Sequence, residues 1–264
     1  MRVLVPTAFL LFAASGAWAF GPAAHQAVTN RAIETLPKGL KPFYKTHRLE
    51  IPSLSLDAET KEEGPERRFP VDRLLSFPFT ELPRSESALT ARHGDALGPA
   101  RLPWLIQESY ERLLTAFRAR DKDKILTESD TLAALVTDLR NPLALADNAD
   151  GQKTGQHGLF VRFSVRLPEA MGPRLKLKPD AARFLDEPKE YVFSMVNGTY
   201  VWLDNLLYQE DLARRGQGGY AERYYEALEL RAGKLLEQML SSAAQDAGSY
   251  WYTAWTQAGR PALP

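Results

Sequence analysis

Apolar residues recur at intervals of three and four along several long segments, which predicts a largely helical protein. The pattern is clearest in residues 102–118 and 125–140. Its apolar positions there are Leu105, Ile106, Tyr110, Leu113, Leu114 and Phe117, then Leu132, Leu135, Val136 and Leu139. Similar spacing predicts helices over residues 24–36, 187–209 and 219–245, with residues 247–256 as a last aromatic turn.

Three segments lack this period. Residues 49–103 are rich in Pro, Ser and charge, and we expect them to cross the surface as a long excursion. Residues 146–156 are typical of a turn-rich loop. Residues 159–167 alternate apolar and polar positions, which leaves helix and strand open. The whole pattern predicts an all-α, single-domain fold with long irregular loops.

The N-terminal residues 1–19 have the features of a signal peptide. Arg2 precedes an apolar run over residues 3–14, and Ala17-Trp18-Ala19 is a small-x-small cleavage site. The apolar run is too short for a comfortable membrane span. We therefore expect a periplasmic or secreted protein whose single domain, residues 20–264, begins at Phe20.

The amino-acid composition excludes several kinds of binding and catalytic site. The chain has 33 basic and 33 acidic residues, so it offers no global attraction to nucleic acid or to an anionic membrane. It has no cysteine, which excludes disulfides, thiolate ligands and thiol nucleophiles. Its only histidines are His25, His47, His93 and His157.

Several short motifs follow one another in an order that resembles the zinc-dependent phospholipase C and single-strand-specific nuclease superfamily. They are Phe-Gly-Pro-Ala-Ala-His at 20–25, Phe-Pro-Phe-Thr-Glu-Leu-Pro at 77–83, Leu-Pro-Trp at 102–104, Tyr-Glu-Arg-Leu at 110–113, the segment 148–158, Trp-Tyr-Thr-Ala-Trp at 251–255 and Gly-Arg-Pro at 259–261. The resemblance spans nearly all of residues 20–264. It implies an all-helical domain, a cleft that holds three zinc ions, and hydrolysis of phosphate esters.

The same resemblance implies one complete metal site. The free amine and carbonyl of Phe20 match the family's N-terminal zinc ligand, and His25 and Asp138 match two further ligands. Zinc binds such nitrogen and oxygen donors at about 2.0–2.2 Å. The residues alone leave other interpretations open: His25 as a surface or capping histidine, and Asp138 as an ion-pair partner of Arg140 or Arg68.

The other family ligands are replaced. The family's His-x-x-x-Asp-x-x-x-x-x-His keeps only its aspartate here, because Ala134 and Ala144 stand where the two histidines belong. Arg68 occupies a further histidine position, and Phe160 and Ser164 occupy the final His-x-x-x-Glu/Asp pair. The catalytic aspartate has no clear equivalent, with Asp57 the nearest candidate.

Other chemistry-bearing residues have simpler interpretations. Asp150 and His157 are expected to hold their loop together, and the aromatic residues near the C-terminus to pack in the core. The basic pairs 67–68 and 214–215 are expected to be solvated. The polar segment 92–95 is interpreted as a solvated loop.

These observations favour an exported member of the superfamily with degenerate zinc sites, which is not catalytic and binds a ligand or partner in the family cleft. It would hold at most one zinc ion, or none, and its partner would be a small phosphate-containing molecule or a protein. The first alternative is an active zinc phosphoesterase, acting on phospholipid or nucleic acid, with an altered and metal-poor site. The second is a structural exported protein without a ligand.

Overall fold

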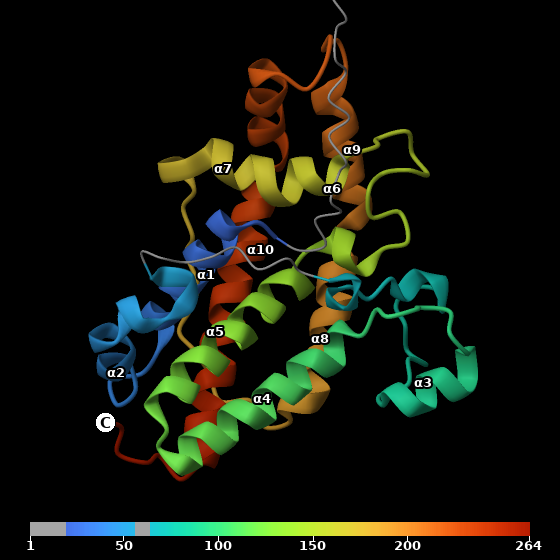
Figure 1. Cartoon of the computed structure of the whole chain (residues 1–264). Helices are drawn as coiled ribbons and strands as arrows, with labels where there is room; N and C mark the ends of the chain where they lie inside the picture. The colour runs from blue at the N-terminus through green and yellow to red at the C-terminus, as the bar shows by residue number, and fades with distance from the viewer. Residues whose placement is uncertain (1–19, 56–63) are drawn as a thin grey trace, which may run out of the picture.

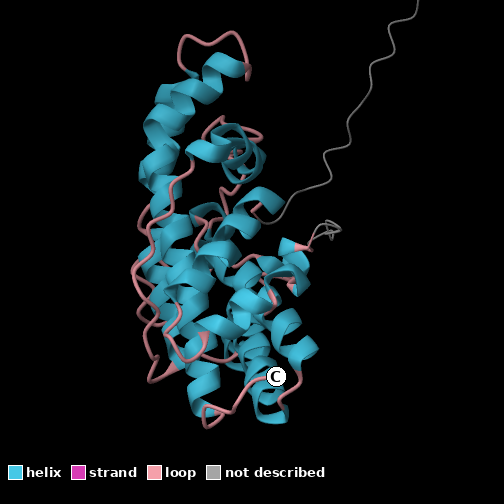
Figure 2. Cartoon of the chain, turned by 90° about the vertical axis from the view of Figure 1, so that its left-hand side faces the viewer, coloured by secondary structure: helices cyan, strands magenta, loops and turns pink. Residues whose placement is uncertain are grey.

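The computed structural model describes residues 20–55 and 64–264, and all regular secondary structure within them is helical (Figures 1 and 2). The predicted all-α class is therefore confirmed. The expected signal peptide and Asp57 lie outside these ranges. Within them, no helix combines the length and the apolar character needed to cross a bilayer.

The described residues form ten α-helices. They are α1 (Pro22–Thr35), α2 (Lys41–Thr46), α3 (Glu86–His93), α4 (Leu102–Ala119), α5 (Lys122–Leu139), α6 (Leu159–Val161), α7 (Leu167–Met171), α8 (Pro188–Tyr200), α9 (Leu203–Arg214) and α10 (Glu222–Gln257). Single turns connect them: η1 (Arg48–Glu50), η2 (Pro52–Leu54), η3 (Pro65–Arg67), η4 (Val71–Arg73), η5 (Pro142–Leu145) and η7 (Gly172–Arg174).

Helices α4 and α5 form a hairpin with a very short connection. Arg120 ends α4 in the left-handed conformation, with φ of 56°, and Asp121 caps α5 by accepting a hydrogen bond from the Lys124 amide at 3.1 Å. A carboxylate at this position satisfies an amide that the helix itself cannot. The hairpin presents the predicted apolar faces of both helices to the core.

Helix α10 is the central element of the fold. Its 36 residues, roughly 54 Å of helix, contact α1, α4, α5 and α9 (Figure 1). Trp251 is fully buried near its end, stacks on Tyr44 with 4.7 Å between ring centroids, and donates its indole N–H to the Ser129 carbonyl. The final aromatic turn expected from the sequence is thus a continuation of this one helix.

Helix α1 crosses α10 closely at a glycine. A Cβ added at Gly248 would lie 2.0 Å from Thr35 Oγ1 and 3.2 Å from the Ala32 carbonyl oxygen. Thr35 has little freedom to move away, because it is buried and its hydroxyl donates to the Ala32 carbonyl at 2.6 Å. The absence of a side chain at Gly248 therefore sets how near the two helices approach.

Gly248→Ala is expected to lower the free energy of unfolding by about 1–3 kcal/mol, because the added methyl group overpacks the contact between α1 and α10. Urea unfolding measures the loss. Gly233→Ala on the same helix is the control, since its Cβ would meet only ordinary contacts at 3.4–3.6 Å. Equal effects of the two substitutions would contradict the role given to the Gly248 contact.

Two predicted elements need correction, and one assignment left open by the sequence is helical. The pattern over residues 187–209 is two helices, because the chain turns at residues 201–202 after Gly198 and Thr199, which are poor helix formers. The ambiguous residues 159–167 are helical, within a run in which the π-helical turn η6 (Arg162–Arg166) joins α6 to α7. The long excursion contains the eight-residue α3, which Ser85 caps by accepting from the Ala88 amide.

Candidate functional site

Asp138 lies fully buried in the last turn of α5 and accepts hydrogen bonds on both carboxylate oxygens. Oδ1 accepts from the Phe20 backbone nitrogen at 3.0 Å and lies 3.0 Å from His25 Nε2. Oδ2 accepts from Arg67 Nε at 2.6 Å and is also paired with Arg67 Nη2. We call Phe20, His25, Arg67 and Asp138 the Asp138 cluster. The three proposed zinc ligands thus do come together in space.

The chain before α1 is held tightly on the π-helical turn. The Gly21 amide donates to the Ser164 carbonyl at 3.0 Å, and a Cβ at Gly21 would lie 3.0 Å from Val165 Cγ1. The buried Phe20 ring packs beside Phe163, with 6.3 Å between centroids. These contacts direct the Phe20 nitrogen towards Asp138. His25, in the first turn of α1 and 8% exposed, approaches the same carboxylate.

The ion-pair partner of Asp138 is Arg67. The alternatives suggested by sequence, Arg68 and Arg140, are wrong: Arg140 pairs with Asp246 on α10, and the Arg68 Nη2 donates to the Ala146 carbonyl. Backbone geometry explains the difference. Arg67 is the last residue of the turn η3, whereas Arg68 is extended, with φ of −124° and ψ of 168°, so the two side chains leave the backbone in different directions.

The segment after Arg67 runs beside η5. The Phe69 amide donates to the Ala144 carbonyl at 2.8 Å, and this bond fixes the directions in which the side chains of residues 67–69 point. Burial, together with the nearby Arg73 guanidinium, lowers the pKa of Arg68. The Arg67 side chain is only 15% exposed, so the expectation that this basic pair is solvated is wrong for Arg67.

Three of the replaced ligand positions belong to the core. Ala144 and Ser164 are 0% exposed and Phe160 is 4% exposed, while Ala134 is half-buried. The Ser164 hydroxyl accepts from Asn141 Nδ2 at 2.7 Å, and the Phe160 amide donates to Asp150 Oδ1. Their packing explains why small and apolar residues suit these positions.

The Asp138 cluster matches only part of a zinc-binding set. In residues 20–55 and 64–264, no three His, Asp or Glu side chains lie together in a way that could hold a metal ion. The Phe20 nitrogen and the His25 ring are at hydrogen-bond distance from Asp138, and the other carboxylate oxygen already has a cationic partner in Arg67. These residues do not fit a three-zinc centre. A single ion at Phe20, His25 and Asp138 stays a prediction.

Asp150 organises the loop that precedes α6. Its two oxygens accept from the amides of Gly158 and Phe160, at 2.8 and 3.2 Å. This agrees with the structural role expected from the sequence. His157 contributes through its backbone carbonyl, which accepts from Arg162 Nη1 at 2.6 Å.

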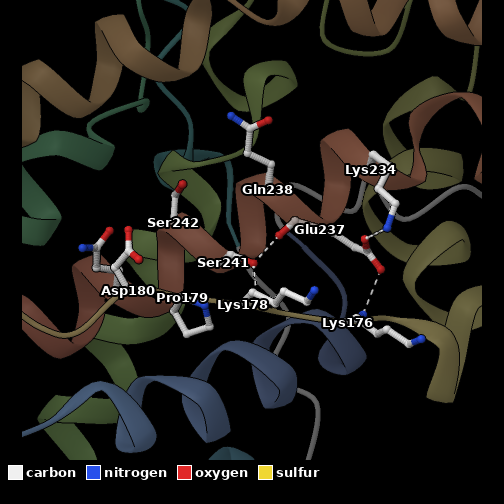
Figure 3. Close-up of a pocket in the computed structure, with 10 residues that line it drawn as sticks. Lys176, Lys178, Pro179, Asp180, Lys234, Glu237, Gln238, Ser241 and Ser242 are labelled. Carbon is white, nitrogen blue, oxygen red and sulfur yellow. Dashed lines mark hydrogen bonds and ion pairs between the residues drawn. The ribbon is translucent and has the colours of Figure 1, made fainter.

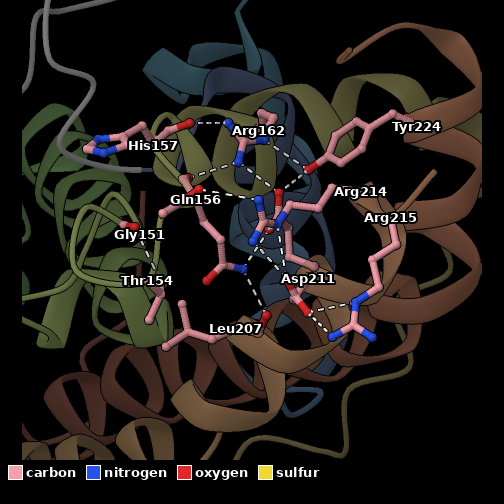
Figure 4. A network of polar contacts seen from close by, with 12 residues as sticks. Gly151, Thr154, Gln156, His157, Arg162, Leu207, Asp211, Arg214, Arg215 and Tyr224 are labelled. Carbon is pink, nitrogen blue, oxygen red and sulfur yellow. Dashed lines mark hydrogen bonds and ion pairs between the residues drawn. The ribbon is translucent and has the colours of Figure 1, made fainter. Parts of the chain in front are cut away.

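A second buried ion pair, which sequence reasoning missed, joins this loop to α9 and α10 (Figure 4). Arg162 Nη2 lies 2.7 Å from Glu210 Oε1, with side-chain exposures of 6% and 0%. Arg162 also donates to the Tyr224 hydroxyl, and Glu210 accepts from Tyr224 and from Gln156 Nε2. Burial raises the pKa of Tyr224, so its hydroxyl stays a donor.

Glu210 and Arg162 are far apart in sequence, and no spacing rule marks them as partners. We therefore call Gln156, Arg162, Glu210 and Tyr224 the Glu210 network. Its side chains bond to one another and to the backbone carbonyls of Gln156, His157 and Leu207, which is typical of a network that stabilises the fold. The adjacent basic pair, Arg214 and Arg215, is bound to Asp211 on the surface (Figure 4).

No protein-family model and no curated protein matches this chain. The likeness to the zinc-dependent phospholipase C and nuclease superfamily consequently rests on the short motifs alone.

Proposed function

We propose that the protein is an exported, non-catalytic relative of the zinc-dependent phospholipase C and single-strand-specific nuclease superfamily, which binds a ligand or partner. The observation that supports this most directly is the buried pairing of Asp138 with Arg67. In this proposal a guanidinium takes the place of the cation that the corresponding carboxylate would bind in the family.

The chemistry of the cluster favours this assignment. Zinc catalysis of phosphoester hydrolysis requires an ion that keeps a position open for water and contacts the phosphoryl oxygens. A guanidinium balances the charge of Asp138, but it cannot coordinate a water molecule and activate it to hydroxide as a zinc ion does. An ion inserted beside Asp138 would also meet the positive charge of Arg67 at close range.

The main alternative is an active zinc phosphoesterase with a metal-poor site, acting on phospholipid or nucleic acid. It is favoured by the convergence of the Phe20 nitrogen, His25 and Asp138. If cleavage after Ala19 frees the amine of Phe20, these groups are the donors that one zinc ion would use. The two proposals differ in what they expect of the correctly processed protein.

Protein that begins at Phe20 is expected to hold at most one zinc ion per chain and to show no zinc-dependent hydrolysis above that of His25→Ala. The substrates are phosphatidylcholine vesicles, single-stranded DNA and RNA, assayed with excess zinc, and bound metal is measured by mass spectrometry. His25→Ala removes a proposed ligand and leaves the Arg67–Asp138 pair in place. Turnover that His25→Ala abolishes would establish the enzyme instead, and three tightly bound zinc ions would contradict the proposal of degenerate zinc sites.

A further inference from the structure

The segment between α7 and α8 forms an extended strap, residues 176–182, over the junction of α1 and α10. Backbone amides hold it to α10: Lys176 donates to Glu237 Oε1 and Lys178 to Ser241 Oγ, each at 2.9 Å (Figure 3). The Ala182 amide donates to the Thr35 carbonyl of α1. The strap therefore has a fixed path across both helices.

Side chains alternate along this extended backbone. Leu177 is buried at 5% exposure, whereas Lys176 and Lys178 on either side of it are exposed. The Leu-Lys-Leu-Lys order of residues 175–178 thus anchors one face of the strap and presents lysines on the other.

A hollow lies on each side of the strap. One, of about 390 Å³, is bounded by the strap and α10 (Figure 3). The other, of about 560 Å³, is bounded by the strap, the second half of α1 and the turn that follows it. Lys178, Pro179 and Asp180 line both. Each has the size of a small-molecule site, and none of the lining residues is aromatic.

The two hollows carry an excess of positive charge. Their basic residues are Arg31, Lys38, Lys41, Lys176, Lys178 and Lys234, and their acidic residues are Glu34, Asp180 and Glu237. Two of the acids are already engaged, since Lys45 lies 3.2 Å from Glu34 and Lys234 lies 2.6 Å from Glu237.

Four of the cations that line the hollows are available to a ligand. Across residues 20–55 and 64–264, the side chains of Arg31, Lys38, Lys176 and Lys178 make no hydrogen bond or ion pair, and Asp180 is the one acid in the hollows not bound to a cation. In a chain of zero formal charge, this is a local field that attracts anions.

We propose that the strap binds a small soluble polyanion that carries at least two phosphoryl groups, one on each side of the strap. Lys178 faces both hollows and would contact both parts of such a ligand. Lysine ammonium groups bind phosphate as point charges, and the Ser242 and Gln238 side chains in the first hollow add neutral donors. Neither hollow offers an aromatic face for a base or an apolar ring.

This site is separate from the Asp138 cluster. His25 lies in the first turn of α1, whereas Arg31, Glu34 and Thr35 belong to its last turns. The proposal therefore does not depend on the family assignment or on the absence of catalysis, and it can fail or succeed independently of them.

Calorimetric titration with tripolyphosphate at low ionic strength tests the proposal. We expect saturable binding to the native protein that 150 mM salt weakens, because the contacts are exposed ion pairs. Lys178→Gln is expected to weaken it at least about tenfold, which is the loss of one good charge contact. Lys38→Gln, on the other side of the strap, is expected to weaken it as well, and orthophosphate to bind more weakly because it cannot reach both sides.

Lys124→Gln is the matched control, because Lys124 is an exposed lysine outside the hollows, with 74% of its side chain accessible. Circular dichroism confirms that each variant is folded. No binding up to millimolar tripolyphosphate would overturn the proposal, as would equal effects of Lys178→Gln and Lys124→Gln. Binding to vesicles that contain phosphatidic acid is measured separately. If the protein binds these vesicles but not tripolyphosphate, the ligand is a lipid headgroup and the proposal of a soluble polyanion is wrong.

Discussion

Asp138→Asn is expected to lower the free energy of unfolding by about 3–5 kcal/mol, because it removes the negative charge from a buried ion pair and keeps the Arg67 guanidinium. Asn keeps the shape of the side chain, but its amide group is a donor, and it would face the donors of either Arg67 or Phe20. A loss of this size is a large fraction of the stability of an ordinary domain, about 5–15 kcal/mol. Urea unfolding followed by circular dichroism measures it.

The control for Asp138→Asn is Glu229→Gln, which removes the acid of an exposed ion pair with Arg174. Exposed pairs contribute about 0–1 kcal/mol, so this substitution should have little effect. Arg67→Met provides the second half of a double-mutant cycle. We expect Arg67→Met/Asp138→Asn to be less destabilised than the sum of the single variants, because each single variant already loses the same interaction between the two side chains. Additive losses would show that the two residues do not act as a pair.

The fold class and most helices were predictable because each helix buries a continuous apolar face. The period in residues 102–118 and 125–140 corresponds closely to α4 and α5. Pattern alone did not predict the turn between α8 and α9, since apolar residues continue through it. It also did not reveal α3, which buries only Leu89 and is too short to show a period.

The Asp138 cluster was predictable only in part. The family likeness placed Phe20, His25 and Asp138 together, and the structure brings them to hydrogen-bond distance. It could not tell which arginine would join them, because the direction of a side chain changes with every residue where a turn passes into an extended segment. Arg67 pairs with Asp138, whereas the part-buried Arg68 side chain donates to the Ala146 carbonyl. Whether the cluster ever binds zinc depends on the competition between the metal and this guanidinium, which sequence does not describe.

The Glu210 network depends on tertiary packing to an even greater degree. Its members come from the loop before α6, the π-helical turn, α9 and α10, and each contributes a polar group to a site that excludes water. No local pattern links residues so far apart along the chain. A composition rule would instead have placed Arg162 and Glu210 on the surface, as charged residues usually are.

Glu210→Gln is expected to destabilise the protein by about 3–5 kcal/mol, because it leaves Arg162 buried without a negative partner. The Gln side chain fits the same space but can supply only one acceptor oxygen, while Arg162, Tyr224 and Gln156 all donate towards this position. The leftover donors would stay buried without partners, which adds to the loss. Thermal and urea unfolding measure the change.

The neighbouring acid supplies the control for this prediction. Asp211→Asn removes the partly exposed acid that pairs with Arg214 and Arg215, one residue after the fully buried Glu210 on α9, and should change stability far less. Because the Glu210 network fastens residues 156–162 to α9 and α10, Glu210→Gln should also increase hydrogen exchange at the amides of the loop before α6, whereas Asp211→Asn should not. Similar unfolding free energies and unchanged exchange in the two variants would mean that the buried pair does not hold these elements together.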